Sequence, residues 1–599
     1  MNRYKLLALS IAILPNFARA EGPPATFCNP LNLDYGWAGK QHRHSADPVI
    51  VLFKDRYYLF ATDDVPGYRV SDDLLTWKNI LFTPEQRKLM SDNDIGTYCA
   101  PAVATDGKHL YFIRMSRRKG DKTVPVMRSA DPLAGNWEQC GELRVTGDPC
   151  LFFDDGRAWL YHGLDKPTKV FEIATKTWTE IPDSERQLRP EINNHEDFFG
   201  GYERGRRELV AEIDTESWLG KFKTRPCQEA AWMTKRNGKY YLQYSTPGTV
   251  THWYCDTVME GPSPTGPFKH VDYAPVSLKV GGFMGSAGHS CVFQDKHANW
   301  WRVTTLWIGV HDLFERRIGL HPVRFDNDGR MRTDTALGDY PQILPNGPRD
   351  GISNRLAGSW VKSFGKTVNA SSSLTDREPQ LAADENCRTW WSAATGNEGE
   401  WFSLNLGATT RTSSIQVNFA EQDASTAVAR KSSVPLRYKA WKSSDGKSWE
   451  SLSGDALRTP NGPHDFIVFD QPQEISHLKI ECISMPGGGK FAIRDLRVFG
   501  PPAGDPPPAV PAPVVKRHAD DDRNATIKWQ PVAHADGYLV RFGDTPDRLW
   551  QTIQLQGGSH DSLTTHVLNR GVPCHFRIDT FNAHGLTAGK GITAAPSSP

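Results

Sequence analysis

The chain has 599 residues, enough for several domains that each have a full core. Its formal net charge is +1, which argues against nucleic acid or an anionic membrane surface as a partner. The 19 tryptophans and 17 tyrosines belong either to a β-rich core or to platforms on which sugar rings stack.

The N-terminus has the pattern of a secretory signal. Arg3 and Lys5 precede an apolar stretch, residues 6–14, that is too short to span a bilayer. Ala18-Arg19-Ala20 fits the small-x-small rule for cleavage. The sequence therefore predicts a signal peptide over residues 1–20, cleavage near Ala20 and export to the periplasm or the outside of the cell. Export permits disulfides, but the spacing of the ten cysteines fixes no pairing.

Five segments between residues 28 and 345 repeat one pattern. Each opens with a small or polar residue and continues as a short apolar run. Most then turn through Asn-Gly or Asp-Gly into an aromatic-rich run, which is a hairpin signal. Repeated hairpins of this kind predict a five-bladed β-propeller with one blade per repeat. The repeats open at Asp47, Ala100, Asp148, Glu229 and His289.

Three of these openings carry a carboxylate: Asp47, Asp148 and Glu229. In a propeller the openings converge on the central axis, so the three acids would share one pocket. Paired acids suit glycoside hydrolysis, because one protonates the leaving oxygen and the other activates water or attacks carbon. A third carboxylate can raise the pKa of the acid by like-charge repulsion. A lone Asp at a strand start is more commonly a turn cap, but three acids at equivalent positions favour catalysis.

This region resembles the family 43 glycoside hydrolases over about half of the chain. The resemblance is carried by Ala46–Phe53, Gly147–Gly156, Glu229–Leu242 and Gly288–Ser290. The order Asp, Asp, Glu within matching hydrophobic frames is specific to that family.

The resemblance implies a role for each acid: Asp47 is the general base, Asp148 the pKa modulator and Glu229 the general acid. It also implies inversion of configuration, with Asp47 and Glu229 about 6.5–9.5 Å apart. Ala230 stands where the family usually has Gly after the acid. Tyr98-Cys99 replaces the usual Trp before Ala-Pro, which would reshape the pocket.

Other side chains are candidates for the substrate or for an ion. Trp232 either stacks on sugar or supports the blade, and Arg317 either contacts sugar hydroxyls or makes a structural salt bridge. By the resemblance His289 faces the axis as a ligand of calcium or water, unless it is a hydrogen-bonded core histidine. Glu196, in the insert before the fourth repeat, is the alternative acid if Glu229 fails. The chemistry itself requires no cofactor.

Alternating strands predict a β-sandwich over residues 354–500. It resembles a discoidin domain, the fold of family 32 carbohydrate-binding modules, in Ala383–Asn386 and Thr389–Ser392. The resemblance implies a structural calcium near Asp384, and Trp390 and Trp391 fit core positions better than a ligand platform.

A Pro-rich linker over residues 501–513 follows, expected to be extended and semi-rigid. Residues 514–595 then resemble a fibronectin type III domain, with Trp529 as an early core residue, and we expect a spacer or contact module. The chain should be nearly all β.

The sequence therefore predicts an exported, inverting exo-glycosidase that trims side chains of plant cell-wall polysaccharide. An α-L-arabinofuranosidase or β-xylosidase is favoured, and an exo-β-galactosidase on galactan or arabinogalactan is the alternative. A non-catalytic carbohydrate-binding protein is the alternative from another class. The expected partner is a polysaccharide or oligosaccharide, without nucleic acid or a membrane span, and the sequence leaves the oligomeric state open.

Overall fold

The computed structural model describes residues 25–597 except 92–96, 117–119, 164–167, 189–226, 247, 350–355, 433, 453, 520–521 and 570. Its helices in this part are short: α1 (Pro84–Met90), α4 (Thr426–Lys431) and the 3-10 turns η1 (Pro132–Ala134), η3 (Pro379–Ala382) and η4 (Pro486–Gly488). The rest of the regular structure is β, which confirms the expectation that the chain is nearly all β. No helix in the described ranges is long and apolar enough to cross a membrane. The predicted signal peptide and Glu196 lie outside the described residues.

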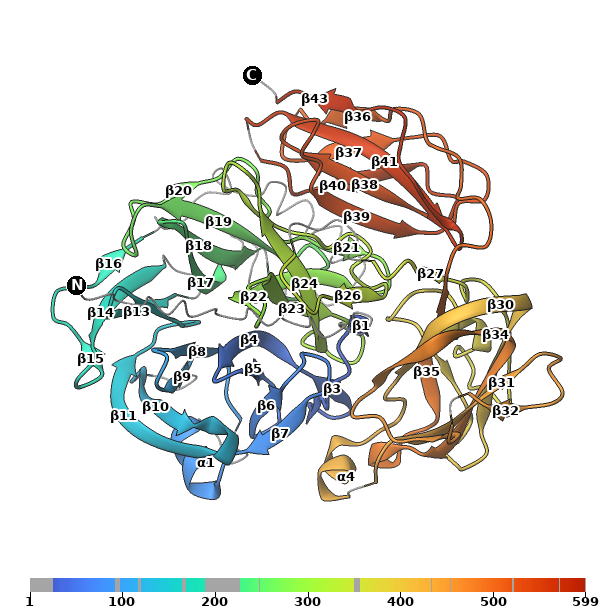
Figure 1. Cartoon of the computed structure of the whole chain (residues 1–599), viewed down its shortest axis with the longest axis horizontal. Helices are drawn as coiled ribbons and strands as arrows, with labels where there is room; N and C mark the ends of the chain where they lie inside the picture. Colours follow the sequence, from blue (N-terminus) through green and yellow to red (C-terminus); the bar gives the residue numbers. More distant parts are fainter. Residues whose placement is uncertain are drawn as a thin grey trace, which may run out of the picture.

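Residues 46–333 form five successive antiparallel sheets, shown from blue to light green in Figure 1. The first contains β4 (Ala46–Phe53), β5 (Arg56–Thr62), β6 (Gly67–Ser71) and β7 (Lys78–Leu81), and the second β8 (Pro101–Thr105), β9 (Leu110–Arg114), β10 (Thr123–Asp131) and β11 (Asn136–Arg144). The third contains β12 (Cys150–Asp154), β13 (Arg157–His162), β14 (Lys169–Ala174), β15 (Thr179–Glu180) and β16 (Arg186–Gln187). The fourth contains β17 (Glu229–Arg236), β18 (Lys239–Thr246), β19 (Cys255–Gly261) and β20 (Lys269–His270), and the fifth β22 (Gly285–Gln294), β23 (Trp300–Trp307), β24 (Arg316–Phe325) and β25 (Met331–Thr333).

Tight turns join the first two strands of these sheets as the sequence predicts. Both central residues have positive φ at Asp155-Gly156 and at Asn237-Gly238. Such a pair is the type I′ turn, whose twist matches that of the flanking strands. Asp154 pairs directly with Arg157 and Arg236 with Lys239, so each loop has two residues.

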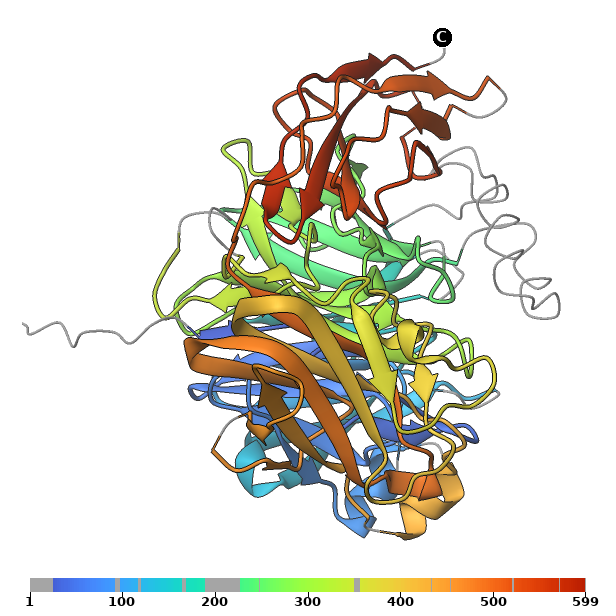
Figure 2. The ribbon, with the colours of Figure 1, turned by 90° about the vertical axis from the view of Figure 1, so that its right-hand side faces the viewer.

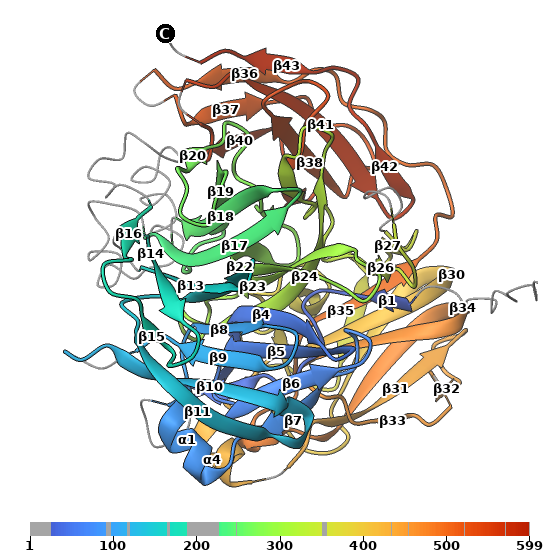
Figure 3. The ribbon, with the colours of Figure 1, turned by 60° about the vertical axis from the view of Figure 1, so that its left-hand side comes forward.

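The five sheets close into a ring. Their first strands contact one another in the cyclic order β4, β8, β12, β17, β22 and back to β4. Figure 3 shows the sheets of β4 and β8 packed side by side. At the join between the fifth and first sheets, β1 (Ala25–Phe27) pairs with β26 (Gln342–Leu344), and the Asn29 side chain bonds the N–H and the C=O of Leu320. A short hairpin of β2 (Gly36–Ala38) and β3 (His42–His44) leads into the first sheet.

Residues 360–500 form the second unit, one nine-stranded system folded around its own core. It lies on the side of the first sheet and of β3 in Figure 1 and towards the viewer in Figure 2. Trp391 lies fully buried in its core, and Trp390 is 7% exposed, so both are core residues as predicted. Its strands are β27 (Trp360–Val361), β28 (Thr367–Ala370), β29 (Trp391–Ser392), β30 (Trp401–Phe419), β31 (Arg437–Ser443), β32 (Glu450–Ser451), β33 (Leu457–Arg458), β34 (His464–Ser484) and β35 (Ala492–Gly500).

Residues 514–595 form a third unit of two sheets. One sheet has β36 (Val514–Arg517), β37 (Ala525–Lys528) and β40 (Ser562–Thr565), and the other has β38 (Gly537–Gly543), β39 (Gln551–Gln556), β41 (Cys574–Asn582), β42 (Gly585–Thr587) and β43 (Thr593–Ala595). Residues 46–333, which contain the five sheets of the ring, are called here the ring-of-sheets unit. Its strand β21 (Val280–Gly281) pairs in parallel with β39 and so extends the larger sheet of the third unit.

The sequence leaves a spacer and a contact module open for the third unit, and its contacts favour the contact module. Trp253, Cys255 and Leu278 of the ring-of-sheets unit belong to the same buried cluster as Trp529 and Ile553. The predicted linker also packs against the unit instead of standing free. Val510 is fully buried in that cluster, and its C=O accepts a hydrogen bond from the N–H of Lys590 at 2.8 Å. The third unit is therefore part of one continuous core.

Removing residues 501–599 is accordingly expected to destabilise the whole protein. The truncation exposes Trp253, Cys255 and Leu278 to water and leaves β21 without its partner strand. We expect a melting temperature several degrees lower and a smaller soluble yield, measured by thermal unfolding of the chain that ends at Gly500. A truncated chain with the melting temperature and aryl-glycosidase activity of the full protein would restore the spacer interpretation.

Buried charge joins the ring-of-sheets unit to the second unit. Glu315, next to β24, binds Arg494 of β35 at 2.7 Å, and Arg317 of β24 binds Glu421 at 3.5 Å. All four side chains are at most 4% exposed. Removing one partner of such a pair leaves an uncompensated buried charge, which costs about 3–5 kcal/mol. The two units are thus fixed to each other.

Candidate active site

A pocket of about 390 Å³ opens at the centre of the ring. It is lined by the three acids that the repeats place there, Asp47, Asp148 and Glu229, and by His289. Asp47 and Asp148 are only 5% and 4% exposed, whereas Glu229 is half-buried. Residues spread over more than half of the ring-of-sheets unit therefore meet in one cavity. Tyr98 and Cys99 also line it, as expected from their place beside a repeat opening.

An unusual backbone conformation recurs where the first strands begin. Asp47, Ala100, Ala230 and His289 have φ of 51°, 42°, 61° and 39°. The pairing register slips beside three of them, between Ala46 and Val49, Glu229 and Trp232, and Gly288 and Cys291. A bulge of this kind re-aims a side chain at the end of a strand, and here it turns the openings towards the pocket. The conformation also explains why glycine suits the position that Ala230 occupies.

Three of these residues with a left-handed backbone conformation are held in place by hydroxyl groups from the neighbouring sheet that comes before theirs in the ring. The N–H of Asp47 donates to Thr305 Oγ1 at 3.0 Å, that of Ala100 to Thr62 Oγ1 at 2.7 Å, and that of His289 to Ser245 Oγ at 2.8 Å. Each acceptor lies on the second strand of the sheet before. The site residues are thus fixed by the contacts between neighbouring sheets, which favours a rigid arrangement.

Asp47 lies between two cations. Its Oδ1 is 3.0 Å from His289 Nδ1 and 3.3 Å from Arg316 Nη1. Burial alone would raise the pKa of Asp47, but His289 and Arg316 outweigh that effect, and the pKa lies below its ordinary value. The carboxylate is therefore ionised at neutral pH and can accept a proton.

Asp148 has the opposite electrostatic character. Burial raises its pKa to about 7; His289, 3.8 Å away, opposes the rise, and Glu229 and Asp47 add to it. Its Oδ2 accepts the N–H of Ala230 at 3.1 Å, which links it to the residue after Glu229. Repulsion from ionised Glu229 and Asp47 thus helps Asp148 to keep its proton close to neutrality.

Glu229 accepts hydrogen bonds at both oxygens. Tyr254 OH donates to Oε1 at 2.5 Å, and Cys227 Sγ donates to Oε2 at 3.4 Å. Tyr254 is fully buried and belongs to the loop before β19. Because the tyrosine hydroxyl is a much stronger donor than the Cys227 thiol, the proton of a neutral Glu229 is better placed on Oε2 than on Oε1. The ten cysteines, all of which lie in the described residues, form no disulfide in this structure.

The raised pKa of Asp148 predicts a pH-dependent cost to folding. Between its ordinary pKa of 3.8 and about 7, the folded protein keeps a proton that the unfolded chain releases, so stability falls as pH rises through this window. Asparagine has no charge to bury. We expect Asp148→Asn to raise the melting temperature at pH 8 and to raise it less at pH 5, with no such trend in the exposed control Asp72→Asn. An equal shift at both pH values would contradict the assignment.

The structure corrects two of the predicted substrate contacts. Arg317 is fully buried and points away from the pocket, towards the second unit. Its Nε donates there to His464 Nε2 at 2.8 Å. Its neighbour Arg316 lines the pocket instead, because successive strand residues face opposite ways.

Trp232, the second predicted substrate contact, does not line the pocket. Its indole N–H donates to Val292 O at 3.2 Å, and its ring packs among the cores of neighbouring sheets. The sheet-supporting alternative therefore holds for Trp232.

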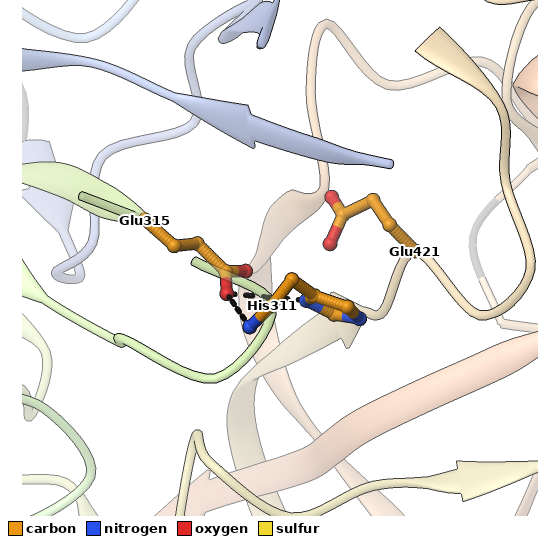
Figure 4. Close-up of side chains that lie close together, drawn as sticks. All are labelled: His311, Glu315 and Glu421. Atoms are coloured by element: carbon orange, nitrogen blue, oxygen red, sulfur yellow. Dashed lines mark hydrogen bonds and ion pairs between the residues drawn. The ribbon is translucent and has the colours of Figure 1, made fainter. Parts of the chain in front are cut away.

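The described residues bring together three metal-type ligand atoms at His311, Glu315 and Glu421, a group that does not include His289 or Asp384. Figure 4 shows His311 pointing towards Glu315, with Glu421 on a facing segment. Arg494 binds both glutamates, at 2.7 and 3.3 Å, so guanidinium already supplies the positive charge. The group fits a buried ion-pair network better than a metal site.

Two family models match the chain. The model for glycosyl hydrolases family 43 matches residues 42–331, and that for the F5/8 type C domain matches residues 367–496. A "Xylosidase/arabinosidase" of Bacteroides ovatus is 27% identical over 36% of this chain and 65% of its own length, so the chain spans just under two thirds of that relative. "Xylosidase/arabinosidase 43A" of Humicola insolens is 30% identical over 39% of this chain and 74% of its own length.

The chain belongs to glycosyl hydrolases family 43. The match to the F5/8 type C model likewise confirms the discoidin-like second unit. Among solved structures, "Bacteroides ovatus Xyloglucan PUL GH43B" aligns with 95% of this chain and 92% of its own, at 16% identity and a TM-score of 0.40. Family 43 membership gives the pocket its class of chemistry, the hydrolysis of glycosidic bonds.

Proposed function

We propose that this family 43 protein is an exported, inverting exo-glycosidase that removes α-L-arabinofuranosyl or β-D-xylosyl units from plant cell-wall polysaccharide. The observation that carries the proposal is the meeting of Asp47, Asp148 and Glu229 in one pocket. We also propose that the five sheets are the blades of a five-bladed propeller, supported by the cyclic contacts of their first strands. The two sheets of the third unit support a fibronectin type III fold.

In this proposal each acid has one part in a single displacement. Asp47, ionised by His289 and Arg316, removes a proton from water as that water attacks the anomeric carbon. Glu229 delivers its proton to the departing glycosidic oxygen from Oε2. Asp148 supports the protonated state of the pair and binds the N–H of Ala230. The released sugar then has inverted configuration, because water attacks the face opposite the leaving group.

Two observations support the exo mode and the sugar class. The pocket's 390 Å³ lies near the lower end of the usual range for ligand sites, which suits one terminal sugar better than a long chain. Both relatives described above carry the name xylosidase/arabinosidase.

The His289 side chain serves in this proposal as a cationic partner of Asp47, because its carboxylate neighbours overcome burial and raise its pKa.

The proposal is tested by following sugar release from nitrophenyl α-L-arabinofuranoside, β-D-xyloside and β-D-galactoside. We expect hydrolysis of one of the first two, with the first-formed anomer inverted in a proton NMR time course. Release from the galactoside alone would favour the exo-β-galactosidase. A first-formed product with the same anomeric configuration as the substrate would contradict the inverting mechanism. If no sugar is released from the three glycosides or from arabinan, arabinoxylan and galactan, and the protein binds those polymers, the non-catalytic alternative is favoured.

A further inference from the structure

A second pocket lies at the far end of the fifth sheet from the acids. It encloses about 500 Å³, within the usual range for ligand sites. In β22 and β23, Gly288 pairs with Thr305 beside the active site, whereas Gln294 pairs with Trp300 at the other end, where this pocket lies. Trp550 of the third unit completes its wall. The pocket, called here the seam pocket, thus occupies the junction between the fifth sheet and the third unit.

Positive charge dominates the seam pocket. Its lining includes four arginines and one carboxylate, that of Asp326. Asp326 is already engaged, since its Oδ1 accepts the N–H groups of Asp328 and Arg330, each at 2.9 Å, and Arg548 Nε lies 3.7 Å from its Oδ2. The four arginines are Arg236, Arg324, Arg332 and Arg349. Arg332 has a second carboxylate nearby, because its Nη2 lies 3.9 Å from Asp334 Oδ2.

Two of these arginines lack an acidic partner within the described part of the chain. Neither Arg236 nor Arg324 lies within ion-pair distance of a carboxylate there, and Arg324 Nε is buried without a hydrogen bond. Burial lowers the pKa of Arg324, with Asp334 opposing. A partly buried guanidinium without a carboxylate in ion-pair contact is unfavourable, so an anion in the pocket would be stabilising.

Aromatic rings hold the guanidinium groups in fixed planes. Arg236 Cζ lies 4.6 Å from the ring centre of Phe325, and Arg332 Cζ lies 4.7 Å from that of Trp550. In Arg236, stacking of this kind leaves the N–H edge of the guanidinium available to a planar carboxylate. Trp300 is half-buried beside Phe325, with ring centres 5.3 Å apart, and adds apolar surface to the pocket.

We propose that the seam pocket binds a uronic-acid residue of an acidic glycan, with its carboxylate between Arg236 and Arg324 and its ring against Trp300. A uronate matches both features of the pocket, whereas an inorganic anion uses only the charge. The proposal adds a glycan-binding site on the face opposite the active site and requires no catalytic turnover. It ties the enzyme to polysaccharides that carry uronate groups.

Isothermal titration of the full-length protein tests the proposal. The probes are tri-galacturonate, its methyl ester, and a xylo-oligosaccharide that bears glucuronate, at low ionic strength. We expect a uronate probe to bind, the uncharged ester not to bind, and Arg236→Gln and Arg324→Gln each to weaken binding about tenfold or more. The exposed control Arg56→Gln should bind as the wild type does.

Two further measurements separate this site from the proposed active site. Glu229→Gln should retain uronate binding, and Arg236→Gln should retain the wild-type kcat/KM on nitrophenyl glycosides. The proposal is overturned if neither uronate probe binds, if the ester binds equally well, or if both arginine variants bind as the wild type does. Full displacement of the uronate by an equal concentration of sulfate would also overturn it, because the pocket would then be a general anion site.

Discussion

Glu229→Gln is expected to lower kcat/KM by about 10²–10⁴-fold, the usual contribution of a positioned general acid. Glutamine keeps the size of the side chain and still accepts a hydrogen bond from Tyr254, but it has no acidic proton to give. The loss should be larger on an oligosaccharide than on a nitrophenyl glycoside. A sugar alkoxide needs protonation as it leaves, whereas nitrophenolate departs with little help. Initial rates on both substrates measure the difference.

The matched control for this change is Glu138→Gln, which removes one carboxylate from the exposed strand β11, where Glu138 binds Arg128 at 2.6 Å. Its kcat/KM should equal that of the wild type. If Glu229→Gln retained full activity, the acid would have to be another residue, and Glu196 would be the first to replace. A uniform loss on both substrates would indicate damage to binding instead of loss of the proton donor.

Asp47→Asn is expected to reduce kcat by about 10²–10⁴-fold while KM changes little, because the amide cannot take a proton from water. The fold should survive, since asparagine tolerates the left-handed conformation that Asp47 adopts at φ 51°.

Asp47→Ala provides the comparison. It should lose as much activity, but it should also unfold at a lower temperature, since alanine in this conformation costs about 1–2 kcal/mol. The two variants thus separate the chemical role of the carboxylate from the demand of the backbone. Asp47→Asn with more than a tenth of the wild-type kcat would contradict the base assignment.

The meeting of the three acids was predictable because the sequence repeats in register. Each acid occupies the same position of a hairpin unit, so a ring of such units brings Asp47, Asp148 and Glu229 together without any knowledge of side-chain packing. The aromatic runs and Asx-Gly turns predicted the strands in the same way. These signals are local, and local patterns determine which residues form each sheet.

What the sequence could not reveal depends on contacts between units. Arg316 and Arg317 are adjacent and chemically alike, and only the register of β24 against β23 determines which of them faces the pocket and which faces Glu421 of the second unit. Tyr254 carries no motif, although strand placement brings its hydroxyl to Glu229. The composition of the proline-rich stretch before the third unit predicts an extended, semi-rigid linker, but it does not reveal that Val510 is buried against that unit.

The pairing of Val280 with Ile553 and of Ala25 with Leu344 has a consequence for synthesis. During synthesis β1 is made long before its partner β26, and β21 lacks its partner β39 until residue 556 has been added. Prematurely terminated products therefore expose unpaired edges and apolar surface, the features that chaperones and proteases recognise. Cells should accumulate this enzyme only as the full-length polypeptide, so quality control would discard fragments that still contain every catalytic acid.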